Sequence, residues 1–144
     1  MLFLGQYHHT IDDKNRLTVP SKFRDVLKNE SVLYVSKGLD NCLELRDEKQ
    51  FNVWAEKLRQ LGDGKKTARA LTRQIMSQSG EVTIDNSGRI KINQFQLDLI
   101  GIKKDVVIVG NNNKLEFWTP EAWEKYQTDN SSLEDYADEL GDSF

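Results

Sequence analysis

Short runs of alternating apolar and polar residues, separated by polar turns, occur along much of the chain and predict β-strands. Two stretches share this pattern closely: TIDDKNRLTVP at residues 10–20 and TIDNSGRIKIN at residues 83–93. Their apolar positions coincide at a constant separation of 73 residues: Ile11 with Ile84, Leu17 with Ile90, and Val19 with Ile92. A repeated strand–turn–strand unit indicates a duplicated module, and its turn is the first place to look for function.

Each copy of the turn places an aspartate four residues before an arginine: Asp12 and Arg16 in the first copy, Asp85 and Arg89 in the second. The residue before the arginine is Asn15 or Gly88, and both residue types adopt positive φ at low cost, so we expect a left-handed position in each turn. The aspartate can accept backbone N–H groups and also pair with the arginine. A guanidinium held in this way suits phosphate oxygens or the acceptor edge of guanine. The alternative is an ion pair at a solvated hairpin tip that contributes little to stability. Because the aspartate–arginine pair occurs at the same position in both copies, we favour a functional role over a simple surface ion pair.

The rest of the chain repeats one order of elements in both halves: strand, turn, strand, short helix, strand, turn, strand, helix. In the first half, strands are predicted at residues 6–11, 16–19, 32–36 and 42–46, with the first two forming one hairpin. A short helix follows Pro20, and Asp47 with Gln50 resembles a capping box that begins a longer helix. The longer helix carries an apolar stripe: Phe51, Trp54, Ala55, Leu58 and Leu61.

In the second half, strands are predicted at residues 81–84, 89–92, 106–109 and 114–118, with a turn at residues 110–113. One helix is expected between Asn93 and Gly101, and another after the N-cap pair Thr119–Pro120. The glycines at positions 62 and 64 separate the halves. The helix after them carries a predicted buried stripe: Ala68, Leu71, Thr72, Ile75 and Met76.

This pattern divides the chain into four parts: a first half at residues 1–62, a connecting helix at 63–79, a second half at 80–127, and an acidic, mobile tail at 128–144. Within the tail, Leu133, Tyr136 and Leu140 have the spacing of one helical face and offer an alternative in which the tail docks.

The composition of the 144 residues, 38% hydrophobic and 30% charged, is typical of a globular protein. No apolar run approaches the ~20 residues of a membrane span, and the start of the chain lacks the pattern of a signal peptide. The single cysteine, Cys42, excludes an internal disulfide, fits a reducing cytoplasm and is expected to be a small buried hydrophobe.

The net charge of −3 is distributed unevenly. Residues 129–144 hold six of the 23 acidic residues and no Lys or Arg, which leaves 20 basic against 17 acidic residues in residues 1–128. A mildly basic body is compatible with nucleic-acid binding, because the local electrostatic field at the contact, and not the net charge, decides whether a polyanion binds. Residues 57–73 contain six basic residues and one acidic residue. They are either a second phosphate-facing patch or an exposed helix face.

The sequence offers weaker support for two other function classes. Asp12–Asp13 and His8–His9 imitate catalytic or metal-binding pairs, but neighbours on a strand face opposite sides. Since no motif for metal, phosphate or nucleophile chemistry is present, we expect no catalysis, no metal and no cofactor. The tryptophans could serve an RNA-binding or protein-interaction scaffold. However, Trp54 and Trp123 lie on apolar helical faces, which favours core packing. Trp118 stands at a strand end, where both alternatives stay open.

The segments FLGQYHHTIDDKNRLTVPSKFR and DNSGRIKI, each with an aspartate–arginine turn, resemble the MraZ family over roughly residues 1–126. These are bacterial transcriptional regulators of the division and cell-wall gene cluster. The resemblance implies an α+β fold of two tandem swapped-hairpin, AbrB-like halves, which form an intramolecular pseudo-two-fold β core with flanking helices. It further implies a ring-shaped homo-oligomer that binds repeated promoter boxes in double-stranded DNA and is cytoplasmic and associated with the nucleoid.

The resemblance also implies roles for individual residues. Asp12 and Asp85 orient the arginines, and DNA contacts come from Lys14, Asn15, Arg16 and Arg89. The family commonly has Gly before the first arginine; Asn15 stands there instead and adds an amide that can contact a base. The second turn has Asn86–Ser87 where Lys is frequent, so we expect the first turn to do more of the base reading.

Overall fold

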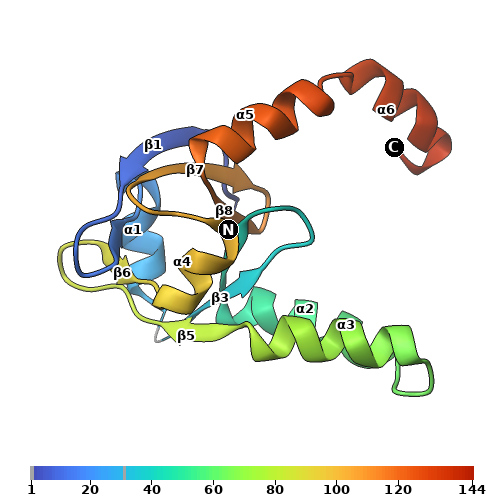
Figure 1. Ribbon diagram of the computed structural model, residues 1–144, viewed down its shortest axis with the longest axis horizontal. Helices are drawn as coiled ribbons and strands as arrows, with labels where there is room; N and C mark the ends of the chain where they lie inside the picture. The colour runs from blue at the N-terminus through green and yellow to red at the C-terminus, as the bar shows by residue number, and fades with distance from the viewer. Residues whose placement is uncertain (1, 31) are drawn as a thin grey trace.

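The computed structural model describes residues 2–30 and 32–144 and has an α+β fold (Figure 1). The strands are β1 (Gln6–Thr10), β2 (Arg16–Thr18), β3 (Leu33–Lys37), β4 (Leu43–Asp47), β5 (Gly80–Val82), β6 (Arg89–Lys91), β7 (Asp105–Asn111) and β8 (Lys114–Trp118). The helices are α1 (Ser21–Lys28), α2 (Glu48–Gln60), α3 (Lys66–Ser77), α4 (Gln94–Ile100), α5 (Pro120–Asp129) and α6 (Leu133–Leu140), with a 3-10 turn η1 (Gly141–Ser143) after α6. None of these helices combines the length and apolar character that a membrane crossing needs.

The two halves of the chain exchange strands. One sheet has the order β1-β7-β8-β4-β3-β5, so β1 pairs with β7 of the second half and β5 pairs with β3 of the first half. The second sheet is the pair β2-β6, again with one strand from each half. This order is symmetric about the β4–β8 seam, which confirms the predicted interleaving of two halves within one chain.

The prediction that residues 6–11 and 16–19 form one hairpin is wrong in its strand pairing. An isolated bridge joins Ile11 to Leu17, but the ladder of β2 runs to β6. Leu17 and Ile90 lie opposite each other in this ladder and are both fully buried. Burying two large apolar side chains between the halves stabilises the exchanged pairing.

The apolar positions that the two copies share form one core. Leu17, Val19, Ile90 and Ile92 are all at most 1% exposed and pack in the same cluster. A smaller cluster beneath α5 holds Trp118, whose ring lies 5.2 Å from that of Trp123. Trp118 therefore belongs to the protein interior.

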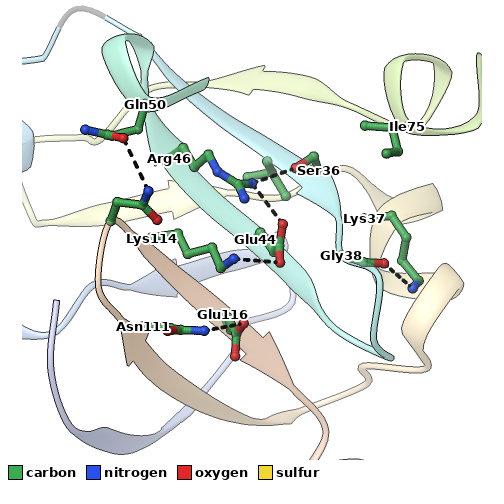
Figure 2. Close-up of polar contacts among 12 residues, drawn as sticks. Ser36, Lys37, Gly38, Glu44, Arg46, Gln50, Ile75, Asn111, Lys114 and Glu116 are labelled. Atoms are coloured by element: carbon green, nitrogen blue, oxygen red, sulfur yellow. Dashed lines mark hydrogen bonds and ion pairs between the residues drawn. The ribbon is translucent and has the colours of Figure 1, made fainter. Parts of the chain in front are cut away.

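The large sheet buries a charged network at the β4–β8 seam, where Glu44 lies opposite Glu116 (Figure 2). Glu44 accepts a hydrogen bond from Arg46 at 2.8 Å and lies 3.4 Å from the Lys114 ammonium. Glu116 accepts hydrogen bonds from Asn111 and from Trp118, each at 3.1 Å. The Arg46 guanidinium also lies 5.0 Å from the centre of the Trp54 ring. The Glu44–Lys114 pair joins strands of the two halves, and together these contacts compensate the buried carboxylates.

Helix boundaries follow local signals. The Asp47 side chain accepts from the Gln50 amide at 2.8 Å, and Thr119 accepts from the Ala122 amide at 3.1 Å, so both predicted N-caps are confirmed. Gly101 ends α4 with φ +75°, as predicted. The predicted turn at residues 110–113 is shorter than expected, because β7 continues to Asn111 and the left-handed residue is Asn112.

Some residues of the predicted buried stripes are exposed. Leu61 is 50% exposed and Met76 is 37% exposed. The hairpin of α2 and α3 projects beyond the sheet in Figure 1, and Leu61 lies at its outer end, in the loop that joins the two helices. The tail is mostly helical, because α5 runs to Asp129 and α6 follows. Leu133 is 81% exposed and Leu140 is 58% exposed, so the predicted apolar face of α6 is not docked within the chain.

Candidate nucleic-acid interface

The first turn holds Arg16 in one orientation. Asp12 Oδ1 accepts the backbone N–H groups of Lys14 and Arg16, each at 2.9 Å, and Oδ2 accepts from Arg16 Nε at 2.7 Å. Asn15 closes the turn with φ +61°, and its N–H donates to the Asp12 carbonyl at 3.0 Å. One carboxylate therefore shapes the turn and fixes the guanidinium that the turn presents.

The second turn repeats this geometry. Asp85 Oδ1 accepts from the Ser87 and Arg89 amides, each at 2.9 Å, and Oδ2 accepts from Arg89 Nε at 3.1 Å. Gly88 has φ +79°. The predicted left-handed position before each arginine is confirmed in both copies, as is the aspartate–arginine pairing.

Both aspartates are held in the charged form. The backbone N–H of Arg16 lowers the pKa of Asp12, and that of Arg89 lowers the pKa of Asp85. Each arginine side chain is 31% exposed, so neither is enclosed by the fold. Because the ion pair uses Nε, it leaves the terminal nitrogens of the guanidinium as a two-donor fork.

The two turns lie side by side through the β2-β6 pair. The register places Arg16 opposite Lys91 and Thr18 opposite Arg89. Leu17 and Ile90 face the core. The residues on either side of them in the strands therefore face away from it: Arg16, Thr18, Arg89 and Lys91. Backbone hydrogen bonds also join each turn to the other copy: the Val19 N–H donates to the Gly88 carbonyl, and the Ile92 N–H donates to the Asn15 carbonyl, each at 2.9 Å. Figure 1 shows the two loops adjacent at one end of the molecule, away from α6 and from the tip of the α2–α3 hairpin.

A sequence model of the family described as "MraZ protein, putative antitoxin-like" matches residues 2–74 and matches again at residues 75–142. The protein named "Transcriptional regulator MraZ" in Spiroplasma kunkelii is 46% identical over 137 residues, which cover 95% of this chain and 95% of that protein. The protein of the same name in Mesoplasma florum is 43% identical over 141 residues, covering 97% of this chain and 96% of that protein. The chain belongs to the MraZ family. The double match also agrees with the repeat that the turns revealed.

Within this MraZ-family fold, the two turns are not equivalent. The Asn15 amide donates to the Gln94 side chain at 3.0 Å, which engages one of its two N–H groups. At the matching position, Gly88 lies against the side chain of Arg24, whose Nε donates to the Val19 carbonyl at 2.8 Å. Lys14, at the tip of the first turn, is exposed.

Sequence reasoning missed Lys91 as a member of this face. Strand alternation in RIKI places Lys91 on the same side as Arg89, which was an available signal. Its position opposite Arg16 follows from the exchange of strands between the halves. Like charges that face each other across a strand pair repel, and an anion above this face would relieve the repulsion.

The residues that imitate enzyme sites have structural partners. His9 Nδ1 lies 2.7 Å from the Thr18 carbonyl, while His8 is exposed on the other side of β1. Cys42, Glu44 and Glu116 offer ligand atoms within 4.8 Å of one another. Both carboxylates already have the partners described above, and burial raises the pKa of the Cys42 thiol. A metal would require the thiolate, so this cluster suits the seam network better than a metal.

Proposed function

We propose that this MraZ-family protein is a sequence-specific, double-stranded DNA-binding regulator of transcription that works without catalysis or a cofactor. The observation that carries the proposal is the pair of aspartate-held arginines on one exposed strand face, next to Lys14 and Lys91. The relatives named Transcriptional regulator MraZ support the regulatory part.

In this proposal, the first turn reads bases and the rest of the face contacts phosphates. The Arg16 fork suits O6 and N7 of a guanine in the major groove, a contact worth ~1–3 kcal/mol of discrimination. Lys14, Lys91 and Arg89 supply positive charge for the flanking phosphates. Asp12 holds the guanidinium before binding, so less side-chain entropy is lost when the contact forms.

One such face contacts too few base pairs to specify a promoter. A ring of identical subunits presents the same face many times, and linked contacts raise the avidity and fix the spacing of the boxes that can be bound together. The proposed target is therefore a set of repeated boxes in the promoter of the division and cell-wall gene cluster. The proposed location is the cytoplasm, in association with the nucleoid. The RNA-binding or scaffold alternative is less well supported, because Trp118 is buried and packs against Trp123.

The test is Arg16→Ala in a binding titration with duplex DNA that carries the promoter repeats upstream of the protein's own gene. Losing a guanine contact of ~1–3 kcal/mol predicts that the DNA affinity falls by about 5- to 150-fold, with a smaller salt dependence. Lys125→Ala is the matched control, because Lys125 also pairs with a carboxylate at 2.7 Å, on α5. Binding by Arg16→Ala with unchanged affinity and salt dependence, at unchanged oligomer mass, would contradict the proposal.

A further inference from the structure

A groove lies between α2 and α3 near the loop that joins them. It has a volume of about 610 Å³, and its lining combines two apolar side chains, three cations and one carboxylate: Leu58, Met76, Arg59, Arg69, Arg73 and Asp63. We call it the α2–α3 groove. It lies on the hairpin that projects from the body of the molecule in Figure 1.

Helix α6 has the complementary character. Its apolar residues recur at helical spacing along one side and are exposed: Leu133 by 81%, Tyr136 by 39% and Leu140 by 58%. Residues 131–144 carry five acidic side chains and no basic one. A helix of eight residues is marginal in water by itself, so its stable state requires a partner for this face.

From this complementarity we propose that α6 of one copy docks in the α2–α3 groove of a neighbouring copy. The leucines would cover Leu58 and Met76, while the carboxylates of α6 would meet the arginines at the rim. This deepens the assembly in the proposed function by naming the surfaces that join its subunits.

The anchoring of α5 favours a second copy over the same chain. Trp123 packs against Trp118 and donates from Nε1 to the Gln6 side chain at 3.1 Å, which fixes α5 to the sheet. Figure 1 shows α6 at the far end of the arm that α5 begins, with the α2–α3 hairpin leaving the body separately. The groove and the helix are different surfaces of one subunit, so the contact is head-to-tail, and such contacts close into rings when the rotation allows.

DNA phosphate fits the groove less well than an acidic amphipathic helix does. A phosphate backbone would leave Leu58 and Met76 without apolar contact. The groove therefore matches a ligand that brings both apolar side chains and carboxylates.

Cross-linking between two differently tagged, co-expressed full-length chains tests the contact. One chain carries Met76→Cys and the other Leu140→Cys; the native Cys42 is buried. A short bis-maleimide should give a product containing both tags, in at least tenfold higher yield than when Leu39→Cys replaces Leu140→Cys. Leu39 is a suitable control because it is 72% exposed and lies in the loop between β3 and β4.

Three results would overturn the proposal: equal yields with the control, no product that contains both tags, or loss of the product when duplex DNA is added. The last would assign the groove to DNA. As a second measurement, Leu140→Asp should lower the mass of the assembly in light scattering, and Leu39→Asp should not. Arg16→Ala should leave the cross-link unchanged, so failure of the docking contact is distinguishable from failure of the DNA-binding proposal.

Discussion

Replacing Gly88 by alanine tests whether the second turn depends on its close contact with α1. Gly88 has φ +79°, and a Cβ built there would lie 2.5 Å from Cδ and 2.8 Å from Nε of Arg24. Arg24 is flexible enough to move away. In doing so it would give up the 2.8 Å hydrogen bond from its Nε to the Val19 carbonyl.

The expected cost has two parts. An alanine in the left-handed region costs roughly 1–2 kcal/mol. Loss of the Arg24–Val19 hydrogen bond costs a further ~0.5–1.5 kcal/mol. Gly88→Ala should therefore lower the free energy of unfolding by about 1.5–3.5 kcal/mol.

The measurement is urea unfolding followed by tryptophan fluorescence, at one fixed protein concentration because assembly contributes to the apparent stability. Gly62→Ala is the control: Gly62 has φ +72°, but nothing lies within 4 Å of its built Cβ, so only the backbone cost of roughly 1–2 kcal/mol applies. In an Arg24→Ala background, the cost of Gly88→Ala should fall to the Gly62→Ala value. Equal costs for the two glycine substitutions in the unaltered chain would refute the reasoning.

Two further predictions concern the aspartates. In Asp12→Asn, the amide oxygen can still accept the backbone N–H groups of the turn, but the amide nitrogen would face Arg16 Nε, donor against donor. DNA affinity measured by fluorescence anisotropy should then fall about fivefold, the low end for a lost Arg–base contact of ~1 kcal/mol. The affinity of Asp13→Asn should fall much less, and equal losses would contradict the orienting role. The lowered pKa values of Asp12 and Asp85 predict that their contribution to stability is present above the ordinary pKa of 3.8 and is lost as the pH falls through the lowered values. Unfolding measured from about pH 5 downward should accordingly be less pH-dependent in Asp12→Asn/Asp85→Asn than in the unaltered protein, and identical profiles would count against the carboxylate hydrogen bonds.

The sequence determined the features that depend on neighbouring residues. The aspartate–arginine spacing, the left-handed residue before each arginine and the caps at Asp47 and Thr119 are all local, because each involves atoms only a few positions apart. Hydrophobic alternation likewise identified Leu17 and Ile90 as corresponding apolar positions of the two copies, and both are buried. The pairing of halves came from the resemblance to a family and not from periodicity.

Only the tertiary structure decided which strands meet. An apolar strand such as β2 can bury its inward side chains against β1 or against β6, and the pattern along the chain is the same in both cases. The exchange of strands places Lys91 opposite Arg16 and brings the two turns to one face. Met76 and Leu140 are exposed although their spacing is that of a buried face. Burial is set by what covers a side chain, and that partner is distant in the sequence.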